Sequence, residues 1–317
     1  MCIFSQPVES VTNTKIFARL AGDGWQHLVY QMNFRSQARN AIILPLPVTQ
    51  PASESDGLTF VSLKNYEDFF ADLERGFPIA LPKSRVSRGL HPDALPDSVL
   101  EVQDVGDFVA SFVPSLKDFS RLDPQFRIPQ ESWDQIPRYA DYGFAVFQLK
   151  SHIGRPHPMA FRFQSRMATG EQDIFFPTVH IHDGEVHDRE GFDHTLYLQA
   201  PQFDAACGNY QKRGYHVTDQ ATGYVRSVQT ARNFCDTDKT QGIVSPDLLV
   251  HRLKKKGHFR NDDIVAHMDL SHARSFPLSN GQMSFLGMTS VAGVMGFRWL
   301  CERRNQLADE RRQSTGH

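Results

Sequence analysis

Short runs of β-branched and aromatic residues, separated by turn-forming residues and prolines, are the feature that most limits how this 317-residue chain can fold. Residues 14–20 and 25–34 are two such runs, and residues 21–24 between them read Ala-Gly-Asp-Gly, which is typical of a tight turn. Residues 41–46 form a continuous apolar run that ends in a Leu-Pro-Leu-Pro sequence, which predicts a buried strand stopped by proline. The first half is therefore predicted to consist mainly of β-strands.

The rest of the chain adds further strands and a few helices. The strand pattern returns at residues 100–105, 108–113, 142–149 and 159–163, whereas residues 66–73 and 289–311 carry apolar side chains at helical spacing. The predicted fold class is α+β: β-rich, with mostly antiparallel sheets, a few short helices and a C-terminal helix.

The length allows one large domain or two ordinary ones. Periodicity weakens after about residue 205. We expect a β-rich main domain over residues 1–205, which carries a histidine segment described below, and a C-terminal extension over residues 206–317 that ends in a helix. A single continuous domain is the alternative.

Composition favours a folded protein of the cytoplasm. Hydrophobic residues make up 40% of the chain and charged residues 22%. The start has no signal-peptide pattern, and the four cysteines lie far apart, which indicates reduced thiols. A formal net charge of −2 gives no reason to expect a nucleic-acid partner, and the basic run at residues 251–260 is predicted to be a solvated loop. No membrane partner is expected, although a C-terminal anchor over residues 281–300 is a weaker alternative to a buried core helix.

The pattern richest in chemistry lies at residues 174–199. Alternation in Val179-His180-Ile181-His182 has the period of a strand and places both histidines on one face. Asp183-Gly184 is a strong signal for a type I′ hairpin. A two-residue turn would set His182 opposite Glu185 and His180 opposite His187, because cross-strand partners project from the same face.

This register predicts a metal site on one side of the hairpin. The candidate ligands are His180, His182 and His187, with His194 as a fourth ligand or a supporting partner. Three imidazoles and a carboxylate suit a divalent transition metal, namely Zn²⁺, Fe²⁺, Mn²⁺ or a copper ion. A solvated face, or histidines satisfied by ordinary hydrogen bonds, would produce the same sequence without a metal.

Cys2 is the second chemical candidate. A Met-Cys start is commonly trimmed, which would leave a cysteine with a free α-amino group that can act as nucleophile and base in one residue. The same pair could bind a metal through sulfur and nitrogen. Alternatively Cys2 is an apolar residue that starts a strand, since Ile3 and Phe4 follow it.

The order of motifs in the first half resembles an uncharacterised bacterial family of unknown function. An early cysteine and a strand at residues 15–18 precede a Leu44-Pro45-Leu46-Pro47 box, and a Val-Gly-Asp-Phe segment at residues 105–108 follows. A Tyr-x-x-x-Gly-Phe-x-Val strand at residues 139–146 completes the series, so the resemblance covers about residues 2–165. It implies no reaction.

Three functions remain open at this point. The leading hypothesis is a metal-dependent enzyme, a hydrolase or an oxidoreductase, that acts on a small-molecule substrate and uses Glu185 as a fourth ligand or general base. The second is an amidohydrolase that uses N-terminal Cys2. The third is a non-catalytic binding or interaction module.

Overall fold

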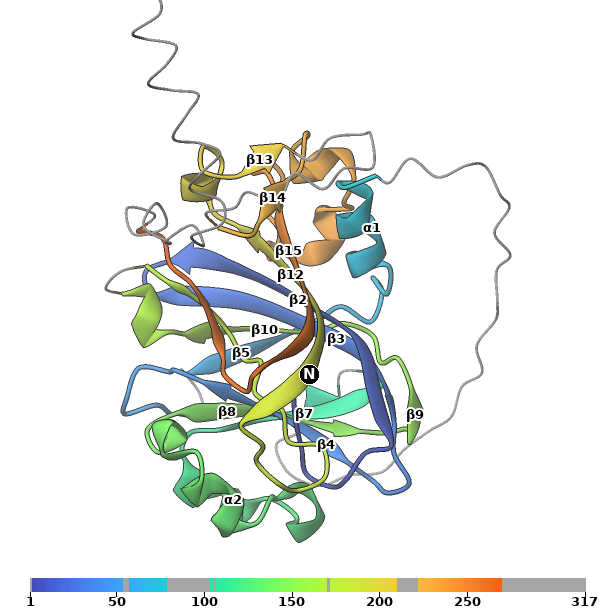
Figure 1. The fold of residues 1–317 in the computed structure, drawn as a ribbon, viewed down its shortest axis with the longest axis vertical. Coiled ribbons are helices and arrows are strands. Elements are labelled where there is room, and N and C mark those ends of the chain that lie inside the picture. The colour runs from blue at the N-terminus through green and yellow to red at the C-terminus, as the bar shows by residue number, and fades with distance from the viewer. Residues whose placement is uncertain are drawn as a thin grey trace, which may run out of the picture. The chain divides into compact units, whose positions relative to one another are not determined.

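The computed structural model describes residues 2–53, 57–78, 103–104, 106–169, 172–209 and 222–269 (Figure 1). These residues belong to one compact unit, Met1–Leu270. The C-terminal helix predicted at residues 289–311 and the alternative anchor at 281–300 lie outside the described residues. Within the described residues, no helix has the length and apolar character needed to cross a membrane.

The larger sheet contains nine of the described strands. They run in the order β13-β14-β15-β12-β2-β3-β10-β5, and β9 pairs with β3 off this path. Most neighbours are antiparallel, but β12 runs parallel to β2 and β13 parallel to β14. The strands are β2 (Ser10–Gly22), β3 (Trp25–Arg35), β5 (Leu58–Ser62), β9 (Ile153–Gly154), β10 (Met159–Gln164), β12 (Arg189–Gln199), β13 (Gly208–Asn209), β14 (Val225–Arg226) and β15 (His251–Arg260).

A second, fully antiparallel sheet has the order β1-β4-β8-β7-β6 among the described residues. Its strands are β1 (Ile3–Phe4), β4 (Ala41–Leu46), β6 (Gln103–Asp104), β7 (Phe108–Val113) and β8 (Gly143–Leu149). The strands β11 (Ile174–Phe176) and β16 (Ile264–Ala266) form a separate pair. The prediction of a β-rich fold with mostly antiparallel sheets is confirmed.

The described helices are short. Two are α-helices, α1 (Phe69–Arg75) and α2 (Gln130–Asp134). The others are 3₁₀ helices: η1 (Leu116–Arg121), η2 (Pro124–Phe126), η3 (Pro137–Tyr139), η4 (Arg166–Ala168), η5 (Pro201–Phe203), η6 (Ala231–Asn233) and η7 (Asp238–Thr240). In Figure 1, α1 lies beside the larger sheet and α2 beyond the smaller one.

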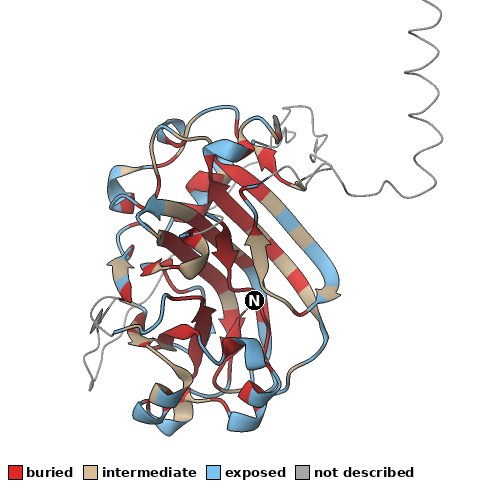
Figure 2. Ribbon diagram, turned by 90° about the vertical axis from the view of Figure 1, so that its left-hand side faces the viewer, coloured by how far each residue is buried: buried red, intermediate tan, exposed pale blue. Residues whose placement is uncertain are grey.

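The hairpin of β2 and β3 follows directly from the sequence. Asp23 and Gly24 have φ angles of 48° and 78°, a left-handed conformation that Gly and Asp adopt at low cost. Adjacent residues of β2 then enter different hydrophobic clusters, because side chains alternate across a strand: Ile16 joins the cluster between the two sheets, and Phe17 joins the cluster under α1. The middle of the larger sheet is therefore buried on both faces (Figure 2).

The larger sheet includes strands from both sides of residue 205, the boundary considered in the sequence. β12 ends at Gln199, and ten of its residues pair with β15, from Arg189↔Arg260 to Leu198↔His251. The basic run at residues 251–260 is therefore a strand, and its prediction as a loop is wrong.

Candidate functional site

The histidine segment, residues 178–187, does not form the predicted hairpin. β11 ends at Phe176 and β12 begins at Arg189, and between them Ile181 makes an isolated parallel bridge with Ile3. Gly184 has a φ of 92°, but Asp183 does not have a positive φ, so a type I′ turn is not formed. The hairpin prediction is wrong because the backbone of this segment finds its partners elsewhere in the chain.

The partners come from the loop that follows β15. Asn261 accepts a hydrogen bond from the His180 N–H at 2.8 Å and donates to the carbonyls of His180 at 2.9 Å and His187 at 3.0 Å. One side chain thus satisfies three backbone groups of the segment, and it is only 6% exposed. The half-buried Asp263 accepts from the Thr178 N–H at 2.9 Å and from the Tyr139 hydroxyl at 2.7 Å.

Asn261 and Asp263 were not found by sequence reasoning. The available signal was Asn-Asp-Asp at residues 261–263, since both residue types commonly bond to backbone groups in turns. That signal does not reveal a partner about eighty positions earlier in the chain. The partner becomes visible only when β15 is placed beside β12.

Three imidazoles gather in a stack, in which His180 and His194 are buried and His182 is half-buried. The rings of His180 and His182 lie 5.3 Å apart with an angle of 15° between their planes, and His180 and His194 also lie 5.3 Å apart at 13°. Phe192 covers His180 with a centroid distance of 4.5 Å. His180 and His182 lie on one side as their alternation predicts, and His194 joins them from β12.

The stack does not have the geometry of a metal centre. Parallel rings present faces to one another, whereas metal ligation needs nitrogen atoms that converge on one point. The described residues contain no group of three or more His, Cys, Asp or Glu side chains that could hold a metal ion. The prediction of a metal-dependent enzyme built on this segment is therefore wrong.

His187 and Glu185 are the clearest departures from the predicted site. Both side chains are exposed, and neither belongs to the stack. His187 Nε2 lies 2.9 Å from Asp183 Oδ2, and this carboxylate raises the pKa of His187. The Glu185 N–H donates to Asp183 Oδ1 at 3.0 Å, so Asp183 organises a local turn at the surface. Without the hairpin register, nothing directs these two side chains toward His180.

Two histidines of the stack, His180 and His182, are held neutral. Burial is the main cause that lowers the pKa of His182 to about 4, and it lowers the pKa of His180 further. The neighbouring imidazoles add to the shift in His180, because two charged rings would repel each other at this distance. At neutral pH the stack therefore acts as an aromatic part of the core.

Cys2 lies next to this segment but is enclosed. The Phe4 N–H donates to the Ile181 carbonyl at 3.0 Å, which aligns β1 with the histidine segment. The Cys2 side chain is 1% exposed, and burial raises the pKa of its thiol to about 12. A cysteine nucleophile acts as the thiolate, so a neutral, buried thiol favours the structural interpretation of Cys2.

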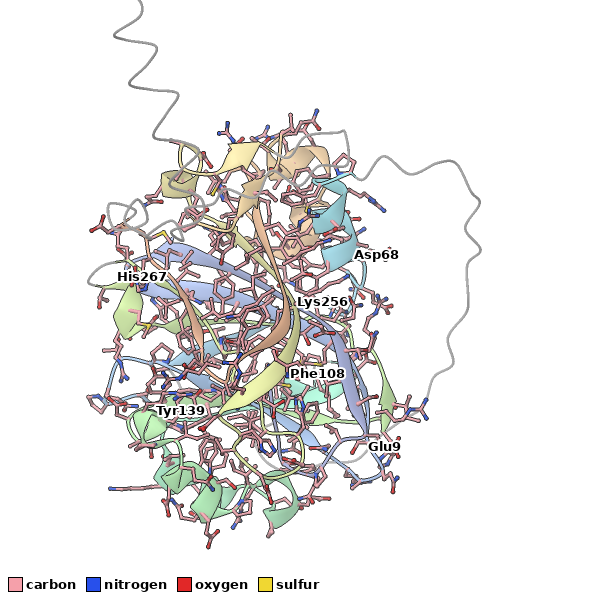
Figure 3. All side chains as sticks on the ribbon, in the orientation of Figure 1. Glu9, Asp68, Phe108, Tyr139, Lys256 and His267 are labelled. Atoms are coloured by element: carbon pink, nitrogen blue, oxygen red, sulfur yellow. The ribbon has the colours of Figure 1, made fainter. Side chains whose placement is uncertain are left out.

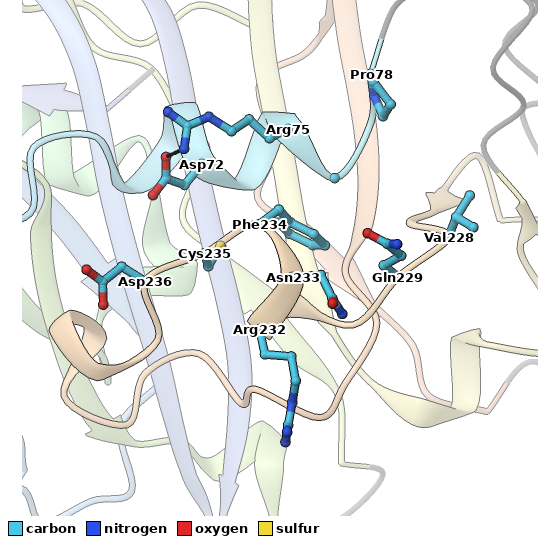
Figure 4. A pocket seen from close by; sticks show the side chains of 11 residues that line it. Asp72, Arg75, Pro78, Val228, Gln229, Arg232, Asn233, Phe234, Cys235 and Asp236 are labelled. Atoms are coloured by element: carbon cyan, nitrogen blue, oxygen red, sulfur yellow. Dashed lines mark ion pairs between the residues drawn. The ribbon is translucent and has the colours of Figure 1, made fainter.

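A pocket of about 670 Å³ lies between α1 and the segment that contains η6 (Figure 4). Its charged side chains are already paired: Arg75 lies 2.6 Å from Asp72, Arg232 pairs with Asp247, and Asp236 pairs with Lys239. The Cys235 thiol on its wall has a pKa raised by burial to about 12. The described residues that line the pocket thus offer no unpaired charge and no thiolate.

The outer edge of β15 is the remaining candidate surface. In an antiparallel pair of strands, only every second residue forms backbone hydrogen bonds with the neighbouring strand. The Asn261 N–H donates to the Asp188 carbonyl, which shows that the odd-numbered positions here bond toward β12. Odd-numbered residues of β15 therefore bond to β12, and even-numbered residues point their N–H and C=O groups outward. The Ser227 N–H donates to the Val250 carbonyl from the outer side, which agrees with this parity.

Only the start of this outer edge is covered by a described strand. β14 pairs with His251 and Arg252 and goes no further. Beyond it the Arg189 guanidinium bonds to the His258 carbonyl, and the Arg260 carbonyl accepts from Asp262. On the side away from β12, residues 253–258 have no strand partner within the described residues, and we name them the open edge.

Gly257 shapes the open edge. Its φ of 128° lies in a region that favours glycine, and a Cβ there would meet only the Phe259 ring at 3.6 Å. We expect Gly257→Ala to lower the free energy of unfolding by about 1–2 kcal/mol through backbone strain. Urea denaturation would measure this. Gly191→Ala on β12 is the matched control, because its φ is not positive and its Cβ would make an ordinary 3.8 Å contact with His258.

No family model matches the sequence. The resemblance to an uncharacterised bacterial family stays a prediction. Among solved structures the chain is similar to the crystal structure of baculovirus P35, with 13% identity, a TM-score of 0.44, and coverage of 84% of this chain and 99% of that one. It is also similar to P35 in its complex with caspase-8, with 12% identity, a TM-score of 0.39, and coverage of 81% and 96%. TM-scores below 0.5 give these likenesses no weight in the functional argument.

The prediction of a small-molecule substrate is wrong, as is the prediction of a metal site. It depended on ligands at His180, His182 and His187, which do not converge. The third hypothesis, a binding or interaction module, is the one that the geometry of this chain supports.

Proposed function

We propose that this chain is a non-catalytic protein-binding module that takes an extended segment of its partner onto the open edge of β15. The observation that carries the proposal is the row of outward N–H and C=O groups at Lys254 and Lys256, which no described residue satisfies. A row of this kind is a template for one more strand. Peptide recognition by strand addition uses these backbone groups for affinity and the neighbouring side chains for specificity.

The position of the edge suits this role. β12 and β15 are held by a ladder of ten residue pairs, and the far end of the ladder is fixed by Asn261. The edge therefore presents its donors and acceptors on a rigid scaffold, which reduces the entropy lost when a partner binds.

Lys256→Pro tests the proposal directly. The Lys256 N–H points away from β12, so proline removes an outward donor without breaking the β12–β15 ladder, and proline is tolerated on edge strands for this reason. We would pan a displayed library of random peptides against the wild-type chain, Lys256→Ala and Lys256→Pro. We expect the enriched peptides to bind the alanine variant and to lose at least about tenfold in affinity for the proline variant.

The three proteins must first show similar urea midpoints, so that a loss of binding reports on the edge and not on folding. Peptides that bind Lys256→Pro as tightly as the wild type would reject the proposal. A selection that enriches no peptide would reject it as well.

We also propose that the protein acts in the cytoplasm. Cys2, Cys207 and Cys235 are free thiols in the described part of the chain, as expected in a reducing compartment. A fluorescent fusion expressed in the source cell tests this, and signal confined to an oxidising compartment would contradict it.

The C-terminal helix at residues 289–311 remains a proposal of the sequence pattern, with apolar side chains along one side. Deleting these residues should lower the helical circular-dichroism signal, because the described helices are few and short. An unchanged signal would contradict a helix there.

A further inference from the structure

Basic side chains line the outer face of β15. Successive side chains of a strand alternate between faces, so Lys254, Lys256, His258 and Arg260 share the face on which Arg252 packs against α1. Lys254, Lys256, His258 and Arg260 are all exposed, and Figure 3 labels Lys256 on this strand. Across the sheet the register adds Lys15 of β2 and Arg189 of β12 to the same face.

Several of these charges are uncompensated. Glu74 binds both Arg252 and Lys254, and Asp262 binds Arg260 at 2.8 Å. In contrast, Lys15, Lys256 and Arg189 form no ion pair with any residue that the structure describes. Asp193 stands opposite Lys256 in the register and carries a negative charge, but its Oδ2 is directed to the Asn13 N–H and no ion pair joins it to Lys256. A positive strip therefore runs beside the open edge.

The inner face of β15 has a different character. Lys255 lies over the rings of Phe192 at 4.9 Å and Phe259 at 4.6 Å, so its charge is engaged by aromatic faces. Leu253 and Phe259 are half-buried on this side. A strand added to the open edge would meet cations on one face and apolar surface on the other.

We propose that the open edge selects an extended acidic segment of a partner protein, in which Asp or Glu alternates with apolar residues. This inference rests on the proposed function and names the chemistry of the partner. Cβ atoms of directly opposed residues in paired strands lie about 4.5–5.5 Å apart, so an acidic side chain opposite Lys256 would meet an uncompensated ammonium group.

Lysines on an edge strand commonly prevent association with other strands. That protection works against neutral and basic strands and is reversed for an acidic one. The strip would therefore exclude most extended chains while it admits those of opposite charge, so repulsion and attraction both contribute to specificity.

A polyanion such as single-stranded nucleic acid would also be attracted to the strip. The open edge favours a peptide, because it offers outward carbonyl acceptors as well as N–H donors at Lys254 and Lys256. Phosphate groups only accept hydrogen bonds and would leave those carbonyls unused.

The test uses three labelled peptides of equal length, in which Val alternates with Glu, with Gln or with Lys. Fluorescence anisotropy would measure their affinity for the full chain at low and at physiological salt. We expect the Glu peptide to bind at least about tenfold more tightly than the Gln peptide, with a smaller difference at higher salt. Lys256→Glu should remove or reverse this preference. Lys117→Glu, an exposed lysine on η1, is the matched control and should leave it unchanged.

The outcomes separate the inference from the proposed function. If the Gln peptide binds as tightly as the Glu peptide and both are lost in Lys256→Pro, strand addition stands and acidic selection is overturned. If Lys256→Pro binds every peptide like the wild type, the proposed function fails. If an oligo-deoxythymidine competes with the Glu peptide and binds Lys256→Pro normally, the strip is a nucleic-acid surface and the inference is overturned.

Discussion

Replacing Asn261 with Ala is expected to lower the free energy of unfolding by roughly 2–5 kcal/mol. The amide of Asn261 satisfies the N–H and C=O of His180 and the carbonyl of His187. His180 is completely buried, so water cannot replace the lost partner at either of its backbone groups. Each buried polar group left without a partner costs about 1–3 kcal/mol. Urea denaturation followed by circular dichroism measures the change.

Asn233→Ala is the control for this experiment. Asn233 is exposed and bonds only to Thr230 within the described residues, so its replacement should change stability by no more than about 0.5 kcal/mol. Asn261→Asp distinguishes the accepted hydrogen bond from the donated ones. The carboxylate still accepts from the His180 N–H but cannot donate to the carbonyls of His180 and His187. Equal stability of Asn261→Ala and the wild type would show that the histidine segment does not depend on the hydrogen bonds of Asn261.

Acidification from pH 7 to pH 5 should destabilise the fold, and His182 should account for about 2 kcal/mol of the loss. Its pKa falls from the ordinary 6.5 to about 4 in the folded chain, because burial penalises the charged ring. The unfolded chain therefore binds the proton first as the pH falls. The stabilising contribution is complete above about pH 6.5 and is lost as the pH falls toward 4.

His182→Phe isolates this contribution. A phenyl ring keeps an aromatic neighbour for His180 but cannot titrate, so the stability difference between pH 7 and pH 5 should shrink by about 2 kcal/mol. The carboxyl group of Asp263 acts in the opposite direction. Burial raises its pKa to about 6, so its contribution is present at low pH and lost as the pH rises through 6. Both proteins contain Asp263, so its contribution cancels when the pH-dependent change in stability of His182→Phe is subtracted from that of the wild type.

His187→Gln is the matched control at the surface. The Asp183 carboxylate raises the pKa of His187, so this group favours the folded state below about pH 6.5 and cannot cause a loss on acidification. If the stability difference between pH 7 and pH 5 shrinks equally in His187→Gln and His182→Phe, the loss on acidification does not come from His182.

The β-rich character of the chain could be predicted from local sequence patterns. Runs of apolar and β-branched residues at residues 14–20, 25–34 and 41–46 became β2, β3 and β4, because alternating side chains must be buried on at least one face of a sheet. The turn at Asp23 and Gly24 followed from residues that tolerate positive φ. These features depend on local geometry, which the sequence carries directly.

The role of the histidines depends on contacts between segments that are far apart in the sequence. Asp183-Gly184 is a local hairpin signal, but the backbone of His180 gains its hydrogen bonds from Asn261, which is remote in sequence. Without a hairpin register, His187 and Glu185 turn to solvent, while His194 enters the stack from β12. The alternation of His180 and His182 survived, because it does not depend on the partner.

The strand character of β15 was also hidden from the sequence. Its outer face and its open edge are both solvated, so only Leu253 and Phe259 show an apolar pattern, and the lysine run resembles a loop. Pairing with β12 makes this run a strand, which holds its charged side chains on one face and its unpaired backbone groups along one edge. A strand with one solvated face needs apolar side chains on the other face only, so its pattern is weak in the sequence. Which of its backbone groups stay unpaired is known only after the sheet has formed.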